Sequence, residues 1–417
     1  MRGRHKRSAP RRGGPAAQPR HATRHQPRRR SERRVAAAPG AAYPLNLDGG
    51  IAASTALLAA LGVVMIYSAT APLAMGSAVP PHLLRHLAGL TLALIAIVGA
   101  LRVPLGAWRR LALPLWAASV ALLAATLALG IEANGARRWL PVPLFGVSLQ
   151  AAEFAKWATS LAVAAVLAGG RPESGRLLRI CLVLAALPAG LLLLQPDFGN
   201  AVVLVVLTGA LLFVGGVPLR RLSGLGALVG VGVATYVALR PYALARLKGF
   251  FSPWQNAHAE GFQLVQSFVA FGRGGIFGVG LGDGRQKLSY LPEAHTDFIL
   301  SVVAEELGLV GVLLVLGAFA ALVVAGLRIA RRAREPFVGL VAFAMTALIA
   351  VPAAVNASVV MGTLPTTGFV LPFLSFGSNS LVVCALAIGV LLRIASHEAR
   401  PARQRVAWAA TRQRRSR

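Results

Sequence analysis

The sequence predicts an all-α, polytopic membrane protein of about ten transmembrane helices, with one long extracytoplasmic loop that contains an interfacial helix. Three observations carry this prediction. The chain has 417 residues, of which 56% are hydrophobic and only 14% charged, whereas soluble domains carry roughly 25% charged residues. The apolar residues gather in stretches near the ~20 residues that a spanning helix needs. The basic residues gather between those stretches and at both ends of the chain. This pattern excludes a soluble enzyme, a disulfide-rich secreted module and a coiled coil.

Ten apolar stretches divide the chain, and only one connection between them, 241–297, is long. We therefore expect one ten-helix membrane domain over 49–393, with a disordered basic tail over 1–48 before it and a basic tail over 394–417 after it. The predicted spans are 50–70, 83–101, 111–130, 150–168, 178–194, 199–217, 222–240, 298–326, 337–361 and 370–393.

The net charge of +29 lies mostly in the two tails. Residues 1–48 carry a net +11 and residues 393–417 a net +7. With the N-terminus in the cytoplasm, 33 of the 43 Lys and Arg residues lie on the cytoplasmic side, as the positive-inside rule expects. An even number of spans then places both termini in the cytoplasm. The outward-facing loops are 71–82, 131–149, 195–198, 241–297 and 362–369.

The N-terminal tail has six prolines and no apolar core, so it is neither a signal peptide nor a folded domain. Attraction to anionic lipids explains its charge; a docking arm for a cytoplasmic partner or for nucleic acid is the alternative. The glycine-rich stretch 271–284 matches GxGxxG in no register and follows no strand, so we expect no nucleotide site there. Because most basic residues set the topology, we expect no nucleic-acid partner.

Charged residues inside spans are costly and often functional. In the fourth span, Glu153 and Lys156 lie three residues apart on one helical face. They either neutralise each other, or Lys156 faces a cavity and meets an anionic substrate. Just before this span, the motif NGARRWL brings Arg137 and Arg138 beside Trp139 at the outer surface. The planar donor fork of arginine suits a phosphate group there.

The long outer loop contains more structure than a spacer needs. Its segment FQLVQSFVAF (262–271) places Phe262, Val265, Phe268 and Val269 on one helical side. A short amphipathic segment of this kind predicts a helix that lies in the membrane interface.

Three titratable residues, Glu293, His295 and Asp297, follow where this loop re-enters the membrane. Burial there would raise the pKa of a carboxyl group toward the working range of a general base, whereas a shallow, solvated site would not. Glu305 and Glu306 lie about two turns deeper, and they must face the protein interior or pair with Arg or Lys.

Two further segments break the helical pattern at the outer side. Asp197, in QPDFGN (195–200), is a second acidic candidate that either joins the site or caps the next helix. The stretch 361–380 contains Pro365 and Pro372, which predict a broken helical segment. Irregular backbone at membrane depth is tolerated only where it lines protein or a wet cavity.

Six motifs together carry a family resemblance. They are GVVMIYSAT, NGARRWL, QAAEFAKWA, QPDFGNAV, the YLPEAHTDFI–AEELG run and LPTTGFVLPFLSFGSNS. Their order resembles the SEDS family (shape, elongation, division, sporulation) over roughly 49–395. PEAHTDF and LPTTG are more similar to the division branch, the FtsW-like proteins, than to the elongation branch, the RodA-like proteins.

The resemblance implies a peptidoglycan glycosyltransferase in the bacterial inner membrane, at the division septum. Its substrate would be lipid II, a disaccharide-pentapeptide on undecaprenyl pyrophosphate. Asp297 matches the essential acidic residue of the family's outer loop, and Arg138 and Lys156 match its basic positions near the fourth helix. Asp297 would deprotonate the acceptor 4-hydroxyl, or hold a divalent cation (Mg²⁺ or Mn²⁺) that serves the same end. We expect no tightly bound cofactor.

Arg138 and Lys156 are expected to hold the pyrophosphate, whose negative charge grows as it leaves. The candidate substrate-binding residues are Arg137, Arg138, Lys156, Glu153, His295, Asp197 and Ser375. The chain departs from the family in two places. It has Gln150-Ala151-Ala152-Glu153 where QPSE is common, and SFGSNS (375–380) where SYGGSS is common.

Two other classes fit parts of the pattern. Intramembrane charges and broken helices also describe a transporter, here a lipid II flippase. A non-catalytic scaffold of the division machinery would use the basic tails as contacts. By resemblance, the partners are a class B penicillin-binding protein that crosslinks the new strand, and other division proteins. The chain itself contains no SxxK motif for crosslinking chemistry.

Overall fold

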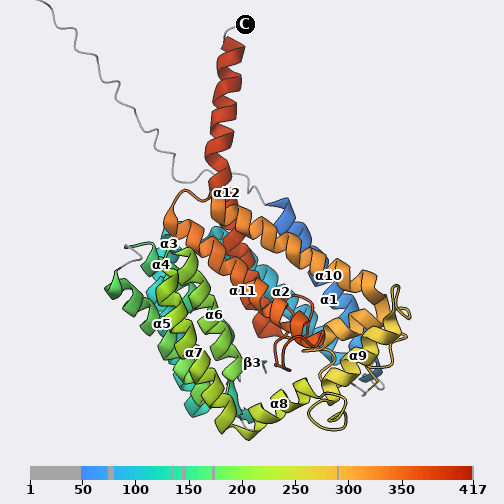
Figure 1. Cartoon of the computed structure of the whole chain (residues 1–417). Helices are drawn as coiled ribbons and strands as arrows, with labels where there is room; N and C mark the ends of the chain where they lie inside the picture. The colour runs from blue at the N-terminus through green and yellow to red at the C-terminus, as the bar shows by residue number, and fades with distance from the viewer. Residues whose placement is uncertain are drawn as a thin grey trace, which may run out of the picture. The chain divides into compact units, whose positions relative to one another are not determined.

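The computed structural model describes residues 48–73, 79–133, 136–142, 147–170, 174–288 and 291–415. The predicted N-terminal tail, apart from Asp48, lies outside these ranges, as do Asn134 and Gly135 of the NGARRWL motif. The helices are α1 Gly49–Thr70, η1 Ala71–Leu73, α2 Pro81–Arg102, α3 Leu105–Leu129, α4 Ala151–Leu167, α5 Gly175–Leu194, α6 Phe198–Val214, α7 Leu219–Leu239, α8 Pro241–Phe251, α9 Phe262–Gly274, α10 Ile299–Arg332, α11 Pro336–Val360 and α12 Ser378–Arg415 (Figure 1).

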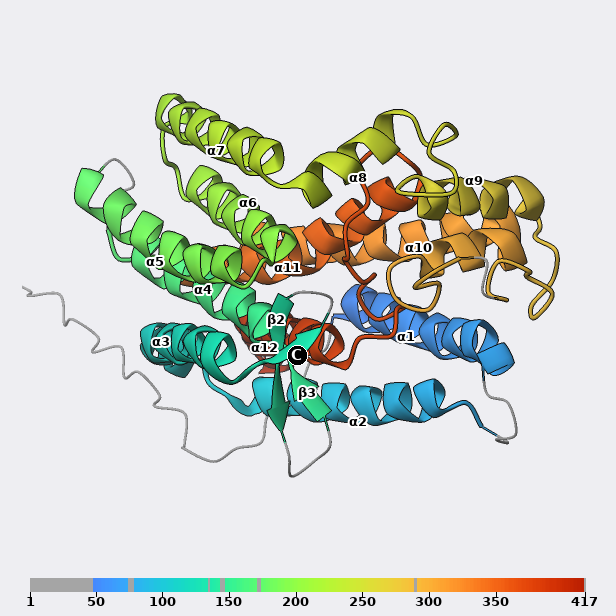
Figure 2. The same cartoon turned by 90° about the horizontal axis from the view of Figure 1, so that it is seen from below.

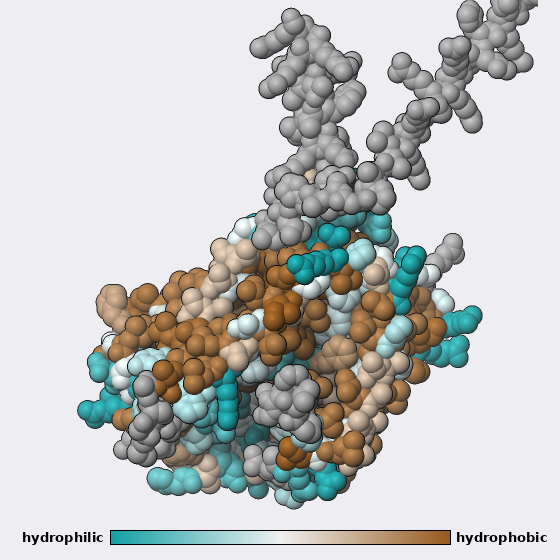
Figure 3. Space-filling view, turned by 180° about the vertical axis from the view of Figure 1, so that it is seen from behind, coloured by the Kyte–Doolittle hydropathy of each residue, from teal (hydrophilic) through white to brown (hydrophobic). Residues whose placement is uncertain are grey.

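Ten of these helices correspond to the ten predicted spans. In the described chain, eight are long and apolar enough to cross a membrane. The other two, α4 and α6, have 17 residues each, which at 1.5 Å per residue still approaches the hydrocarbon thickness. The fold is therefore an all-helical polytopic one, as expected. Figure 3 shows hydrophobic residues over much of one face, with hydrophilic residues gathered toward its upper and lower ends.

Helix α4 lies in the interior of the bundle. It contacts α3, α5, α6, α11 and α12, and most of its side chains are buried. Its small residues Ala155, Ala158 and Ala162 permit this close packing, because each is fully buried. By contrast, α7 has no buried residue, and its main contacts among the described elements are with α6 and α8. Figure 2 shows α7 at the edge of the bundle, with α8 leading from it toward α9.

A small antiparallel sheet fills the loop between α3 and α4. Its strands are β1 Ile131–Ala133, β2 Ala136–Val142 and β3 Val147–Leu149, in the order β1-β2-β3. The sequence predicted only a loop here, because the strands are short and lack a clear alternation of polar and apolar residues. The sheet matters for the site because β2 carries both predicted arginines.

Helix α10 is kinked at Gly308, whose φ of 66° and ψ of −161° are non-helical. The glycine run after α9 packs into this kink: Leu309 donates its backbone N–H to Gly275 O, and Gly280 donates to Glu306 O. A Cβ on Gly278 would lie 2.1 Å from Glu306 O, so only glycine fits there. The glycine run is thus a backbone contact with α10.

The last span differs from its prediction. We expected a helix over 370–393, but α12 begins at Ser378, because residues 361–377 form turns and irregular backbone. Phe373 has a φ of 65°, which breaks any helix there. The helix then continues past 393 to Arg415, through most of the predicted C-terminal tail. The irregular stretch itself confirms the broken helical segment that Pro365 and Pro372 predicted.

Candidate active site

Asp297 lies in the loop just before α10, close to the irregular stretch 361–377. A Cβ on Gly368 would lie 3.5 Å from Asp297 Oδ2, at van der Waals contact, so the Gly368 backbone lies beside the carboxylate. The loop backbone is fixed from α11: Asn356 Nδ2 donates to Asp297 O at 2.7 Å and to Phe369 O at 2.6 Å. One buried amide therefore holds the Asp297 loop and the 366–369 segment together.

The environment of Asp297 favours its protonated form. Burial, and next the negative charge of Glu293, raise the pKa of Asp297 to about 7. The Arg246 charge and a hydrogen bond from Thr296 oppose this rise. Asp297 is half-buried, and the direction of its pKa matches the alternative in which burial raises the pKa of a carboxyl group. A carboxyl group with a pKa near neutrality is suited to general base catalysis.

A tight turn places these groups together. Glu293 has a φ of 56°, and its backbone oxygen accepts N–H bonds from Thr296, Asp297 and Phe298. The Glu293 side chain accepts a hydrogen bond from Thr296 Oγ1 at 2.8 Å. The turn thus aims Asp297 inward while Glu293 stays exposed at the surface.

His295 packs against two rings from other elements. Its ring centroid lies 5.0 Å from that of His82 on α2 and 5.8 Å from that of Phe376. Burial, followed by the His82 charge, lowers the pKa of His295, and Glu293 opposes this. His295 also accepts the Phe376 N–H at its backbone oxygen, at 2.9 Å. The residue is thus a neutral, packed neighbour of the Asp297 loop.

Lys156 is at the centre of a buried polar network on α4 and α6. Its Nζ donates to Glu153 Oε1 and to Asn200 Oδ1, both at 2.7 Å. Asn200 Nδ2 in turn donates to Asp197 Oδ2 at 2.9 Å. Asp197 also caps α6, accepting the Asn200 N–H. The pairing of Glu153 with Lys156 and the capping by Asp197 are both observed.

This network also reaches the Asp297 region. Lys156 Nζ lies 5.7 Å from the centroid of the Phe369 ring, in cation–π geometry. Phe369 belongs to the segment that Asn356 holds against the Asp297 loop. The Lys156 ammonium has three donors, donates to Glu153 and Asn200, and lies over the Phe369 ring.

The two predicted arginines point to different sides of β2, because neighbouring side chains alternate along a strand. Arg137 is exposed and pairs with Glu132 at 3.5 Å. Arg138 donates from Nη2 to Pro196 O, next to Asp197. Its buried Nε has no acceptor within the described part of the chain. The structure therefore brings Arg138, but not Arg137, beside the Lys156 network.

Ser375 is buried, and its Oγ accepts the Leu371 N–H at 2.8 Å. It closes a turn in the irregular stretch. Asn379, two residues after the Phe376–Gly377 step, donates to Ser148 O in β3. The SFGSNS segment therefore supports the loop that faces Asp297 and also contacts the small sheet.

Glu305 and Glu306, near the start of α10, form ion pairs with cations of the outer loop. Glu305 pairs with Arg273 at 2.9 Å and Glu306 with Lys287 at 2.6 Å, which confirms the expectation that each faces the interior or a cation. Ser68 on α1 also donates to Glu306 at 2.7 Å. These two carboxylates of α10 thus anchor the segment that runs from α9 to the Asp297 turn.

The sequence reasoning missed Arg246, Asn356 and His82. Arg246, on α8, donates to Thr366 O at 2.9 Å, and its charge faces Asp297. A signal for it existed: Arg246 is one of the few cations that the topology places on the outer side. The helix over 262–271 was predicted and is observed as α9, but its buried side was not predicted, since Ser267 lies inside and donates to Val360 O. A hydrogen bond to backbone offsets the cost of burying a hydroxyl.

The sequence is similar to those of known proteins over most of its length. The family model FTSW_RODA_SPOVE, described as a cell cycle protein, matches residues 50–400. A probable peptidoglycan glycosyltransferase FtsW from Coxiella burnetii is 41% identical over 360 residues, which cover 84% of this chain and 96% of that protein. The probable peptidoglycan glycosyltransferase FtsW of Halomonas elongata is 39% identical over 375 residues, which cover 88% and 94%.

Solved structures share the fold. A chain from a peptidoglycan synthase complex, described as coordinating polymerization and crosslinking, superposes with a TM-score of 0.70 at 30% identity, covering 85% of this chain and 99% of that one. The rod shape determining protein RodA of Thermus thermophilus gives a TM-score of 0.62 at 29% identity, covering 84% and 97%.

Proposed function

The chain belongs to the SEDS family of FtsW, RodA and SpoVE cell cycle proteins, and we propose that it polymerises lipid II as a peptidoglycan glycosyltransferase with Asp297 as general base. The observation that carries this proposal is the half-buried Asp297 carboxyl beside Gly368, whose pKa of about 7 lies in the working range of a base. It stands on a loop to which Asn356 on α11 donates a hydrogen bond, and catalysis depends on such positioning.

The reaction joins two lipid-linked molecules. Asp297 takes the proton from the 4-hydroxyl of the acceptor sugar, and that oxygen forms a bond to the anomeric carbon of the donor. The bond between this carbon and the pyrophosphate oxygen breaks, so undecaprenyl pyrophosphate leaves with the electron pair. Attack from the side opposite the leaving group inverts the anomeric centre.

The leaving pyrophosphate gains charge and needs cations beside it. Arg138 and Lys156 are the candidates: the buried Nε of Arg138 has no acceptor among the described residues, and the Lys156 ammonium, which donates to Glu153 and Asn200, has three donors in all. Glu153, Asn200 and Asp197 keep the Lys156 ammonium in place. Ser375 and His295 act by supporting the loops around Asp297, through the contacts described above.

A divalent cation remains compatible with this site. Mg²⁺ is often bound by one or two carboxylates together with substrate phosphates. Asp297 and Glu293 would hold it, and it would supply electrostatic stabilisation of the leaving group. No cluster of three or more His, Cys, Asp or Glu side chains occurs in the described residues, so the substrate itself would have to complete the coordination.

We further propose where and with whom the protein acts. The bias of its basic residues supports cytoplasmic termini and an outward-facing Asp297 loop in the bacterial inner membrane, at the division septum. A structural neighbour comes from a peptidoglycan synthase complex, which supports a class B penicillin-binding protein as the crosslinking partner. Other division proteins would recruit the pair.

The test is incubation of the purified full chain with lipid II in liposomes. A polymerase yields glycan strands, whereas a flippase moves labelled lipid II across the bilayer without forming polymer. Strands formed without net translocation support the proposal. Translocation without strands, with the partner transpeptidase present or absent, would contradict it.

A further inference from the structure

Gly368 lies beside the proposed base, and neither its backbone conformation nor the packing of the protein requires a glycine there. Its φ is not positive, whereas Gly308 has a φ of 66°. A Cβ on Gly308 would lie 2.4 Å from Gly278 N, but a Cβ on Gly368 would lie 3.5 Å from Asp297 Oδ2, an ordinary van der Waals contact. An alanine would therefore fit at position 368 without strain in the folded protein.

The place of this missing side chain is open. Asp297 Oδ2 is the one heavy atom of the described residues within 4 Å of a Cβ on Gly368, apart from the two chain neighbours of the glycine. Gly368 itself is exposed, whereas Asp297 is half-buried. The volume that a side chain on Gly368 would fill, which we call the Gly368 space, thus adjoins both the carboxylate oxygen and an exposed residue.

Hydrogen bonds fix the backbone on both sides of Gly368. Two residues before it, Thr366 O accepts from Arg246 Nη1 at 2.9 Å. One residue after it, Phe369 O accepts from Asn356 Nδ2 at 2.6 Å, and the same amide donates to the loop of the proposed base at 2.7 Å. Because these bonds hold the segment against that loop, a side chain added at position 368 stays beside the carboxylate.

The Gly368 space also lies next to the cation assigned to the leaving group. The Phe369 ring, one residue along the chain, has its centroid 5.7 Å from Lys156 Nζ, and consecutive Cα atoms are about 3.8 Å apart. Adjacent residues of one short segment therefore contact the proposed base and the proposed pyrophosphate ligand. In the proposed reaction the attacking and leaving oxygens share one anomeric carbon, so the acceptor must enter close to both groups.

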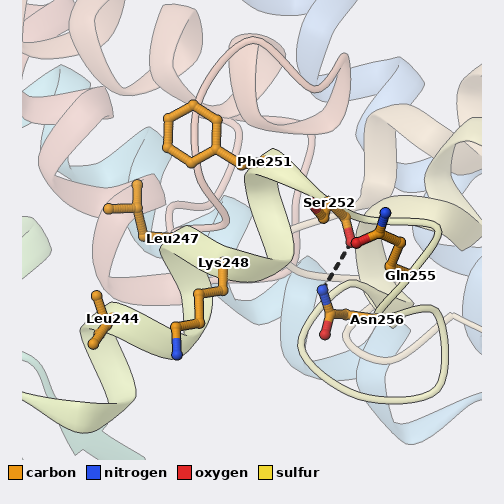
Figure 4. Close-up of a pocket in the computed structure, with 7 residues that line it drawn as sticks. All are labelled: Leu244, Leu247, Lys248, Phe251, Ser252, Gln255 and Asn256. Carbon is orange, nitrogen blue, oxygen red and sulfur yellow. Dashed lines mark hydrogen bonds between the residues drawn. The ribbon is translucent and has the colours of Figure 1, made fainter.

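The pocket on α8 is a different space. It is lined by Lys248, Phe251 and five neighbouring side chains, none of which is Asp297 or Gly368. Figure 4 shows these side chains along α8 and the turn after it, and Phe251 is 73% exposed. Truncation of Phe251 alters this pocket without opening the protein core, which makes Phe251→Ala a control for lipid binding outside the Gly368 space.

We propose that the acceptor hydroxyl reaches Asp297 Oδ2 through the Gly368 space, so that the missing side chain makes room for the acceptor sugar of a lipid-linked glycan. This inference rests on the proposed function and makes Gly368 the residue that determines acceptor access. A hydroxyl that donates to a carboxylate stands about 2.5–2.7 Å from its oxygen, and a Cβ on Gly368 would stand at 3.5 Å. The sugar and a side chain would therefore compete for one volume.

The kinetic test measures initial polymerisation rates of the full chain against lipid II concentration. One added carbon in a binding site discriminates about 10–200-fold, so Gly368→Ala should lower kcat/KM by about 10-fold or more, and Gly368→Val should lower it further. Gly272→Ala is the matched control, because Gly272 is an exposed glycine of α9 whose Cβ would meet nothing within 4 Å. Both alanine variants should unfold at or above the wild-type temperature. A Gly368→Ala protein with the kcat/KM of Gly272→Ala would overturn the proposal.

The pH dependence separates loss of access from a change in the base. If the added methyl group acted only by shielding Asp297 from water, it would raise the pKa of Asp297 further above about 7. Activity would then recover at higher pH, where the base is deprotonated again. Exclusion of the acceptor predicts a deficit that persists at high pH. Full recovery of Gly368→Ala at high pH would overturn the proposal.

A binding arm separates this inference from the proposed function, because it needs no turnover. Lipid II is titrated onto Asp297→Asn protein, alone and combined with Gly368→Val or with Phe251→Ala, and the molecules bound per chain are counted by native mass spectrometry. Gly368→Val should remove one of two bound lipid II molecules, while Phe251→Ala keeps both. This result supports the acceptor site even if the wild-type chain makes no polymer. An unchanged number with Gly368→Val, or a loss with Phe251→Ala instead, contradicts it even if polymerisation is normal.

Discussion

The side-chain amide of Asn356 on α11 lies 2.7 Å from the backbone oxygen of Asp297 and donates a hydrogen bond to it. The same amide nitrogen donates to Phe369 O at 2.6 Å. Asn356 is 2% exposed, so water cannot replace it. This single residue therefore joins the loop of the proposed base to the segment that faces it.

Asn356→Ala should lower activity more than its effect on stability accounts for. One buried and one part-buried carbonyl lose their donor, at a cost of about 1–3 kcal/mol for the buried one, and a displacement of Asp297 by about 1 Å can slow catalysis ~100-fold. Thermal unfolding in detergent and lipid II polymerisation, measured on the same preparation, check this. Thr346→Val is the control, since it removes a buried hydroxyl on the same helix that donates to Ala342 O within its own helix. Equal activity losses in the two variants would contradict the positioning role.

Two variants should separate the structural role of Lys156 from its proposed role in binding the substrate. Removing one partner of a buried ion pair typically costs about 3–5 kcal/mol, whereas replacing both partners is close to neutral. Lys156→Met should therefore destabilise the protein strongly, and Glu153→Gln with Lys156→Met should recover much of the stability. If Lys156 also binds pyrophosphate, the stable double variant stays inactive. Recovery of full polymerisation by the double variant would show that the pair is structural alone.

Arg246→Gln should shift the pH dependence of the reaction. The Arg246 charge lowers the pKa of Asp297, which burial and Glu293 raise, so its removal moves that pKa further up. A base works when deprotonated, and the rising limb of the pH–rate profile should therefore move to higher pH than the limb near 7 of the wild type. Arg246→Lys should keep the original limb. The kcat/KM profile between pH 5.5 and about 9 is the measurement; an unmoved limb in Arg246→Gln would refute the electrostatic contact.

Asp297 should make the folded protein less stable as the pH rises. Its pKa is raised from 3.8 to about 7 on folding, so the folded state binds the proton more tightly than the unfolded state. The stabilisation by the protonated group is complete below pH 3.8 and is lost as the pH rises through 7. Asp297→Asn should thus unfold at a higher temperature than wild type at pH 8, with a smaller difference at pH 5. A larger gain at pH 5 than at pH 8 would contradict the raised pKa.

Most of the fold can be predicted from the sequence, because membrane spans are recognised by their length and hydropathy. The start of α1 at Gly49 and the end of α5 at Leu194 match the predicted spans to within one residue. Helix α12 begins eight residues later than predicted: the apolar stretch 370–377 satisfies hydropathy but folds as turns held by Ser375 and Asn356. Hydropathy does not distinguish lipid-facing from protein-facing residues.

The site was only partly predictable, for a related reason. Acidic residues near a membrane are visible in the sequence, so Asp297, Glu305 and Glu306 stand out. The residues around them come from distant positions in the sequence. Arg246, whose charge acts on Asp297, donates to Thr366 O, 120 residues away, and no local sequence pattern predicts such a contact. The separation of Arg137 from Arg138 likewise follows from a strand that the sequence did not predict.

The central claim, that Asp297 is the catalytic base, is tested most directly by polymerisation of lipid II with Asp297→Asn protein. The substitution keeps the size of the side chain but removes the base, and general base catalysis contributes about 10²–10⁴-fold. We predict a loss of at least about 100-fold in a protein that unfolds at or above the wild-type temperature and binds lipid II normally. A well-folded Asp297→Asn protein that polymerises lipid II at near the wild-type rate would contradict the account.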